Sequence, residues 1–189
     1  MFIYQAEVHC DECGEAAVAA MKMEGKEDTG DSGDFPQEER WGGSSDSPVH
    51  CGTCEVLIPT DLTELGNEYV AQALIDNSGD CDVLQEWSDQ FDLPYPANIG
   101  WDAEAVRVWA ENLGTAVEGL ETFEDAFAGE FNSPEDWAVQ YLEDTGAMHE
   151  IPASLRYYFD HSAYARDVEL GGDVCFIRSG GSTYAFYNH

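Results

Sequence analysis

Two Cys-x2-Cys pairs constrain the fold of this chain more than any other feature of its sequence. The pairs are Cys10-Asp-Glu-Cys13 and Cys51-Gly-Thr-Cys54. Two cysteines three positions apart on a tight turn can both reach one metal ion, and two such pairs can close a tetrahedral structural zinc site. We therefore expect Cys10, Cys13, Cys51 and Cys54 to bind one structural Zn²⁺ in a zinc ribbon over residues 1–60.

The ribbon must carry an expanded loop. Thirty-seven residues separate Cys13 from Cys51, whereas the usual ribbon has about 15–20. The stretch from Met23 to Pro48 is rich in Gly, Ser, Asp and Glu and predicts a long polar loop. Residues 2–8 and 55–58 are short strand candidates, and with the cysteine pairs they predict a small rubredoxin-like ribbon.

Other readings of the cysteines remain open at this point. His9 and His50 each stand directly before a cysteine pair, so either could replace a cysteine as ligand or lie beside the site. A redox pair would need a thioredoxin-like strand and helix around it, which the sequence lacks. Cys81 and Cys175 lie far from any matching histidine pattern, and we expect both to be small buried hydrophobic residues.

Net charge restricts the partners of this protein. The chain has 39 Asp and Glu against 7 Lys and Arg, a net charge of −32 at pH 7. Nucleic acids and anionic membranes are bound through basic side chains, so direct binding to either is disfavoured. Two explanations compete for the charge: adaptation to a molar-salt cytoplasm, and a partner that recognises a polyanion.

The composition predicts a folded, soluble protein. Apolar residues make up 43% of the chain, with nine Phe, nine Tyr and five Trp, more than a disordered acidic chain carries. No apolar run approaches the roughly 18 residues of a membrane-spanning helix. The first residues lack the basic region of a secretory signal, so we expect a cytoplasmic location.

Apolar spacing predicts helices beyond the ribbon. Residues 61–98 fit short helices and a linker, and Pro94-Tyr95-Pro96 marks the expected boundary to a second domain over residues 99–189. In that domain one apolar stripe recurs at spacings of three and four. Its members are Val106, Trp109, Leu113, Ala116, Leu120, Phe123 and Phe127.

Carboxylates occupy the opposite side of the same segment. On one continuous helix, acids seven positions apart would form a row at intervals of about 10.5 Å, close to three base-pair steps of DNA. Gly114, Gly119 and a fresh N-cap at Thr122 favour two helices over one. The acids with this spacing are Glu104, Glu111, Glu118 and Asp125.

Capping residues and a tight turn organise the C-terminal part. Ser133 before Pro134 predicts a helix start, with Gly146 as its end. Further helices are expected from Pro152 and after Asp160. The Ser179-Gly-Gly-Ser182 turn predicts a terminal β-hairpin. We therefore expect an α+β fold: a small rubredoxin-like zinc ribbon plus helices, followed by a mainly helical domain that ends in a β-hairpin.

Several C-terminal segments of this chain resemble the C-terminal domain of the ArdA antirestriction family. The stretches Leu155-Arg-Tyr-Tyr158 and Tyr164-Ala-Arg-Asp167 are the most specific. The resembling segments, in chain order, are Phe123–Phe131, Ser133–Ala138, Ile151–Asp160, Tyr164–Leu170, and Asp173 with the hairpin that closes with Phe186–His189.

The resemblance implies a function. Members of this family resemble bent B-form DNA by displaying carboxylates, occupy the DNA-binding groove of type I restriction-modification enzymes, and are carried by plasmids, transposons and phages. It implies a type I enzyme as the protein partner of this chain, in a bacterial or archaeal cell, and leaves a homodimer open. The family's N-terminal and middle domains are not recognisable before about residue 100, where the zinc ribbon stands in their place.

The carboxylates of the helical region are the candidate contacts to that partner. The runner-up hypothesis is a zinc-ribbon interaction adaptor of a phage or plasmid without DNA mimicry. An enzyme is the weakest hypothesis, because the chain has no HExxH, phosphate-binding loop or nucleophile motif, and zinc held by four cysteines has no open coordination position. The candidate partner-binding residues are Glu104, Glu111, Glu118, Glu121, Glu124 and Asp125.

Overall fold

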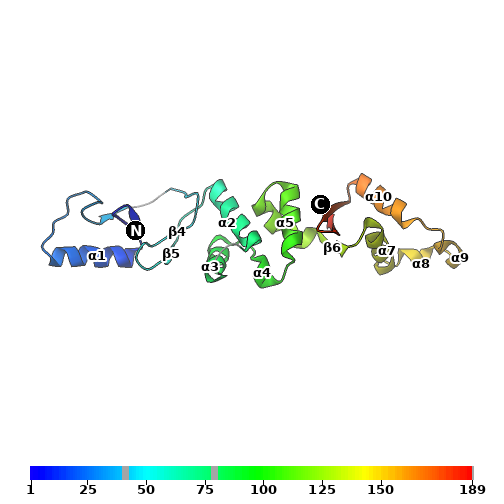
Figure 1. Ribbon diagram of the computed structural model, residues 1–189, viewed down its shortest axis with the longest axis horizontal. Coiled ribbons are helices and arrows are strands. Elements are labelled where there is room, and N and C mark those ends of the chain that lie inside the picture. The colour runs from blue at the N-terminus through cyan, green and yellow to red at the C-terminus, as the bar shows by residue number, and fades with distance from the viewer. Residues whose placement is uncertain (40–42, 78–80, 189) are drawn as a thin grey trace. The chain divides into compact units, whose positions relative to one another are not determined.

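The computed structural model describes residues 1–39, 43–77 and 81–188, and Figure 1 shows the elements in chain order. The chain divides into two compact units, Met1–Tyr95 and Pro96–His189. As the sequence predicts, helices and small sheets are mixed, with a cysteine cluster near the N-terminus and a β-hairpin at the C-terminus. Residues 40–42 of the expected polar loop and the final His189 lie outside the described residues.

A three-stranded antiparallel sheet begins the first unit. Strand β1 (Phe2–Tyr4) lies between β2 (Glu7–His9) and β3 (Gln37–Glu38). The prediction of one continuous strand up to Val8 is wrong, because the chain reverses at two residues with positive φ, Gln5 and Ala6. Neither is a glycine or asparagine, the usual signals of such a turn, so the reversal was not recognisable from local sequence.

Helix α1 (Asp11–Met23) follows β2 directly and was not predicted. Its alanine-rich sequence favours a helix, with acids in the first turn and Lys22 in the last. Gly14 lets the helix lie close to β1, because a Cβ at this position would be 2.1 Å from Cδ2 of Phe2. The polar loop therefore begins after Met23, as expected, but the segment before it is ordered against the sheet.

A second hairpin and two helices complete the first unit. Strands β4 (Val49–His50) and β5 (Leu57–Ile58) pair antiparallel and carry the second cysteine pair in their connection. Helix α2 (Glu64–Asp76) starts three residues before the expected Asn67, because the Thr63 hydroxyl caps it by accepting from the Gly66 backbone N–H at 3.1 Å. Helix α3 (Cys81–Phe91) follows, and both helices match the predicted apolar spacing.

Two helices, and not one, form the acidic segment of the second unit. After the short helix α4 (Pro96–Ile99), α5 (Ala103–Leu113) ends at Gly114, which has a φ of 85°. Helix α6 (Ala116–Ala126) begins after the N-cap Thr115, whose hydroxyl accepts from the Glu118 backbone N–H at 3.2 Å. The predicted break at Gly114 is confirmed, whereas the predicted N-cap at Thr122 is wrong.

A third strand pairs with the C-terminal hairpin. Strand β8 (Ser182–Tyr187) pairs with β7 (Val174–Ser179) and, on its other side, with β6 (Phe127–Phe131). The sequence placed Phe127 at the end of the helical stripe, but this residue begins β6 and stacks on Phe123 at a centroid distance of 4.9 Å. A phenylalanine fits both the apolar face of a helix and a buried strand, so spacing alone assigned Phe127 to the helix.

Four helices of the described residues lie between β6 and β7. Ser133 caps α7 (Pro134–Asp144) and Asp160 caps α10 (His161–Gly171), each by accepting a backbone N–H, as predicted. Between them, α8 (Ala147–Glu150) and α9 (Ala153–Arg156) are single turns. The longer helix expected from Pro152 is absent there, because α9 buries no residue against the core.

The core of the second unit is largely aromatic. Trp109 stacks on Phe186 with a centroid distance of 4.7 Å, and Phe186 is fully buried between helices and sheet. A second cluster packs around Trp137, which stacks on Tyr141 and meets Phe176 edge-on. These large apolar surfaces hold α5, α6 and the sheet together.

The helices of the described residues are short or carry many charges. Within residues 1–39, 43–77 and 81–188, none is long and apolar enough to cross a bilayer.

Close packing of α5 on α6 yields a first prediction. A Cβ at Gly119 would lie 2.5 Å from the Ala110 Cβ and 2.7 Å from its Cα. Gly119→Ala should therefore destabilise the protein by about 1–3 kcal/mol, because the two helices must separate. Urea unfolding followed by tryptophan fluorescence measures the change.

Gly171→Ala is the matched control. Gly171 lies in α10, and its nearest neighbour is a side-chain oxygen at 3.5 Å. There the same substitution should be neutral or stabilise by up to about 1 kcal/mol, the ordinary helix preference for alanine. Equal effects at both glycines would contradict the packing explanation.

Candidate functional site

The four cysteines of the two Cys-x2-Cys pairs form one cluster. Their Sγ atoms all lie within 4.8 Å of one another, and Cys10 Sγ is 3.7 Å from Cys54 Sγ. A tetrahedral ion with sulfur ligands at about 2.3 Å requires sulfur separations of about 3.8 Å. The cluster (Cys10, Cys13, Cys51 and Cys54) therefore has the size and donor set to hold one metal ion.

Two different local structures present the sulfurs. Cys10 is the N-cap residue of α1 and Cys13 lies in its first turn, whereas the second pair lies in the β4–β5 connection. The Gly52 backbone N–H donates to the Val8 carbonyl at 2.9 Å, which ties the second pair to β2. The hairpin is thus held to β2 by a backbone hydrogen bond and brought to the start of α1 by the arrangement of sulfurs.

The cluster's electrostatics favour a bound cation. Burial raises the pKa of Cys51, but backbone N–H groups of Cys54, Cys10 and Thr53 outweigh burial and lower it to about 5. The neighbouring sulfurs, Cys10 first, raise the pKa of Cys13. The cluster therefore favours a thiolate at Cys51 and disfavours one at Cys13, and a bound cation would favour the deprotonated form of both.

The remaining candidate ligands lie outside the cluster. His9 is buried, and its Nδ1 is 3.1 Å from the Thr53 hydroxyl, so it supports the second cysteine pair from beside it. His50 Nε2 accepts from the Trp87 indole N–H at 3.4 Å. Cys81 is exposed at the start of α3, contrary to the expected burial, and Cys175 is half-buried.

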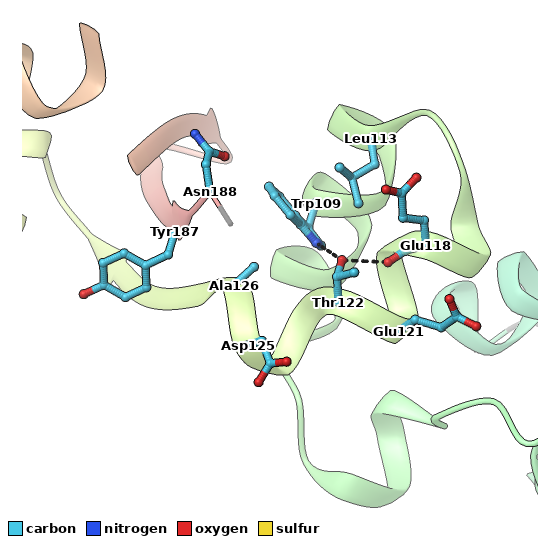
Figure 2. A pocket seen from close by; sticks show the side chains of 9 residues that line it. All are labelled: Trp109, Leu113, Glu118, Glu121, Thr122, Asp125, Ala126, Tyr187 and Asn188. Carbon is cyan, nitrogen blue, oxygen red and sulfur yellow. Dashed lines mark hydrogen bonds between the residues drawn. The ribbon is translucent and has the colours of Figure 1, made fainter. Parts of the chain in front are cut away.

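All four acids of α6 are on the exposed side of this helix. Glu118, Glu121, Glu124 and Asp125 are exposed, and three of them line a cavity with Trp109 (Figure 2). Because the chain breaks at Gly114, the seven-residue spacing does not produce one straight row along a single helix. The α6 carboxylates instead form a compact acidic face, which we call the α6 face.

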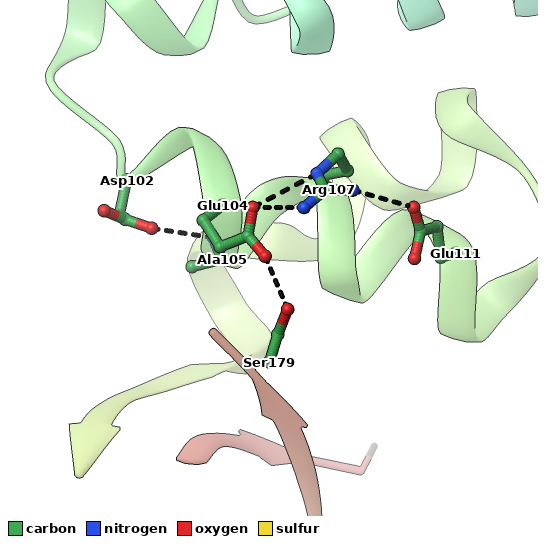
Figure 3. A network of polar contacts seen from close by, with 6 residues as sticks. All are labelled: Asp102, Glu104, Ala105, Arg107, Glu111 and Ser179. Atoms are coloured by element: carbon green, nitrogen blue, oxygen red, sulfur yellow. Dashed lines mark hydrogen bonds and ion pairs between the residues drawn. The ribbon is translucent and has the colours of Figure 1, made fainter. Parts of the chain in front are cut away.

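The two acids of α5 have a different environment, shown in Figure 3. Arg107 Nε donates to Glu104 Oε2 at 3.2 Å, and Arg107 Nη1 lies 3.4 Å from Glu111 Oε1. The Ser179 hydroxyl, at the end of β7, donates to Glu104 Oε1 at 2.5 Å. Arg107 and then Ser179 hold the pKa of Glu104 below its usual range. Glu104 therefore fastens α5 to the hairpin, a role that only the long-range contact to Ser179 reveals.

Comparison with known families settles the relationship of the chain. The family model described as antirestriction protein (ArdA) matches residues 67–183, which is 117 of the 189 residues. The chain belongs to the ArdA family of antirestriction proteins. Neither the curated proteins nor the solved structures contain a match.

The extent of the ArdA match corrects one expectation. The sequence suggested that family likeness begins near residue 100, but the match starts at Asn67 in α2 and includes α3. The apolar spacing of these two segments predicts helices but does not distinguish one family from another, so the family likeness there was missed. The cysteine cluster, at residues 10–54, lies outside the ArdA match.

The Glu104 contacts predict a pH-dependent contribution to stability. Glu104→Gln should lower the free energy of unfolding at pH 7 by no more than about 1 kcal/mol, because the side chain is 34% exposed and solvent screens the ion pair. Since the folded-state pKa is lowered, the contribution is present above the unfolded pKa of about 4.3 and is lost as pH falls through the folded value. Urea unfolding of dilute protein at a series of pH values measures it.

Glu111→Gln serves as the comparison for this measurement. Its carboxylate is 65% exposed and lies farther from Arg107, so the variant should stay close to wild type at every pH. A constant deficit of Glu104→Gln down to the lowest pH would show that lost packing, and not the carboxylate charge, causes the effect.

Proposed function

We propose that this ArdA-family protein acts as a DNA mimic that inhibits type I restriction-modification enzymes by occupying their DNA-binding groove. Family membership supports antirestriction activity in general. The observation that carries the mimicry is the α6 face, where four carboxylates are exposed on one helix of a chain with net charge −32. A groove that binds DNA phosphates presents basic side chains, so such a surface complements it.

Long-range electrostatics provide the mechanism of inhibition. Opposite fields of protein and groove accelerate encounter, and the match of charges fixes the register of the complex. Among the described residues, no basic side chain forms an ion pair with Glu118, Glu121 or Glu124. Their charge is therefore available to the partner, whereas that of Glu104 and Glu111 is shared with Arg107.

For the metal centre, we propose one structural Zn²⁺ held by Cys10, Cys13, Cys51 and Cys54. The four thiols within 4.8 Å and the stabilised thiolate of Cys51 support this proposal. Zinc bound by four thiolates supplies folding energy, and the ligands complete its tetrahedral shell. The ion would join the N-terminus of α1 to the β4–β5 hairpin within the first unit.

A zinc-ribbon interaction adaptor is the second candidate function. One observation favours it: the cysteine cluster lies outside the region that matches the family. Such an adaptor would bind another DNA-processing protein without competing for its groove. Competition with duplex DNA for a type I enzyme distinguishes the two functions, because only the mimic displaces the duplex.

The zinc proposal predicts one zinc per chain and a local collapse when a ligand is lost. Cys51→Ser should remove zinc and unfold the first unit, while the second unit keeps its aromatic core, because the ion supplies folding energy to the first unit alone. Elemental analysis measures zinc, and circular dichroism with limited proteolysis maps the folded part.

Cys175→Ser is the control, since Cys175 lies outside the cluster in the second unit. It should retain zinc and the folded first unit. Purified wild-type protein without zinc, or with a disulfide between the two pairs, would refute the metal assignment.

The mimicry proposal predicts that neutralising the α6 face weakens inhibition. Combined Glu118→Gln, Glu121→Gln, Glu124→Gln and Asp125→Asn substitutions should slow association and reduce inhibition several-fold, with each single change having little effect. Escape of unmodified phage DNA in cells with a type I system, and inhibition of the purified enzyme, measure the effect. A separate Glu104→Gln/Glu111→Gln variant should weaken inhibition less than the four α6 substitutions do.

A charge-matched variant separates the α6 face from total charge. Four exposed acids of the first unit can be neutralised instead: Glu15, Glu27, Glu38 and Glu39. This variant should inhibit nearly as well as wild type, and every variant should unfold cooperatively at about 0.1 M salt, where the Debye length is about 10 Å. An equal loss of inhibition in both variants would show that α6 contributes only net charge. Folding of the wild-type protein only in molar salt would show that the charge is an adaptation to the environment.

A further inference from the structure

A cavity of about 370 Å³ lies among α5, α6 and the end of β8 (Figure 2). Apolar groups from three elements and carboxylates from α6 make up most of its lining, and Thr122 and Asn188 complete it. The apolar lining consists of Trp109, Leu113, Ala126 and Tyr187, and the acidic lining of Glu118, Glu121 and Asp125. The apolar side chains beside the carboxylates distinguish this cavity from an ordinary acidic helix surface.

The wall of the cavity is rigid. Trp109 is only 5% exposed, and its indole N–H donates to the Thr122 hydroxyl at 2.9 Å. That hydroxyl donates to the Glu118 carbonyl at 2.7 Å, and the indole stacks on Phe186 with an interplanar angle of 18°. A ligand therefore meets a surface that is already formed, which lowers the entropic cost of binding.

The carboxylates are arranged on consecutive turns of α6. Glu118 and Glu121 are three positions apart, so their Cβ atoms are neighbours on the surface of α6. Figure 2 shows the Glu118 carboxylate beside Leu113 and the Glu121 side chain extending away from Trp109, so the exposed Glu121 side chain has to rotate to share a ligand with Glu118. Both are exposed, and neither forms an ion pair with a basic side chain in the described part of the chain. The complementary ligand has an apolar stem that covers Leu113 and Trp109 and a cationic head that reaches the carboxylates.

We propose that this cavity receives an arginine side chain of the protein partner, with its methylene groups against Trp109 and Leu113 and its guanidinium against Glu118 and Glu121. The planar guanidinium can bond two carboxylates at once and is weakly hydrated, whereas lysine is a strongly hydrated point charge. The assignment of the arginine to the antirestriction partner rests on the proposed function. The cavity's preference for a guanidinium rests on its lining alone.

This contact differs from charge mimicry in kind. DNA phosphates offer charge and oxygen acceptors to an arginine, but no apolar wall for its stem. An arginine seated in the cavity is partly removed from water, so its contact is less screened by salt than exposed pairs on the α6 face. The cavity would therefore hold the complex at ionic strengths that weaken purely electrostatic attraction.

Titration of the full-length ¹⁵N-labelled protein with two model compounds tests the ligand class. N-acetyl-arginine amide should shift the Trp109 indole N–H signal saturably and bind several-fold more tightly than N-acetyl-lysine amide. The Glu118→Gln/Glu121→Gln variant should bind the arginine compound several-fold more weakly. A non-saturable shift, or equal affinity for both compounds, would overturn the assignment of a guanidinium site.

A charge-matched pair controls for electrostatics. Glu143→Gln/Glu169→Gln removes two exposed carboxylates of α7 and α10 that do not line the cavity. It should leave binding of the arginine compound unchanged, and a loss equal to that of the cavity pair would overturn the proposal. Both pairs replace exposed side chains, so both variants should fold, which the unfolding transition verifies.

Inhibition assays with a purified type I enzyme test the source of the arginine. At raised salt, the Glu118→Gln/Glu121→Gln variant should inhibit several-fold less well than the Glu143→Gln/Glu169→Gln variant. Equal inhibition by both would overturn the partner assignment and leave the proposed function standing. If wild-type protein does not inhibit at all, proposed function and partner assignment fall together, and the model-compound titration still decides what the cavity binds.

Discussion

Electrostatic repulsion among its carboxylates is the constraint that this structure has to satisfy. A net charge of −32 destabilises any compact state, so apolar contacts must outweigh it. In the second unit they come from large aromatic side chains: Trp109 stacks on Phe186, and Phe123 on Phe127. Each such side chain buries far more apolar area than an aliphatic one, which lets a small unit with an acidic exterior remain folded.

The first unit satisfies the same constraint by other means. Its sheets have strands of two or three residues, too short to be stable alone, and α1 has only Gly14 and Met21 buried. The cysteine cluster brings α1 and the β4–β5 hairpin together, and the proposed Zn²⁺ would both crosslink these elements and offset negative charge. The metal proposal therefore fits the few buried apolar residues of α1 and its short strands, whereas α2 buries an apolar face of its own.

Local signals explain what the sequence predicted well. The caps at Ser133 and Asp160, the break at Gly114 and the terminal hairpin depend on neighbouring residues, so they were recognisable without a structure. Strand β6 was missed because only pairing with β8 decides that Phe127 is extended. The clustering of the four cysteines was predictable from their spacing. The link between Glu104 and Ser179 joins residues 75 positions apart, and no local sequence pattern predicts it.

The acids of the second unit divide into two groups by what surrounds them. The Glu104 carboxylate is stabilised within the protein by the ion pair with Arg107 and the hydrogen bond from the Ser179 hydroxyl. Glu118 and Glu121 border an apolar cavity and have no described ion pair, so their mutual repulsion persists in the free protein. A cationic partner relieves that repulsion on binding, and the relief adds to the attraction itself. In the proposed complex, the free energy that this repulsion costs the free protein would therefore be recovered on binding.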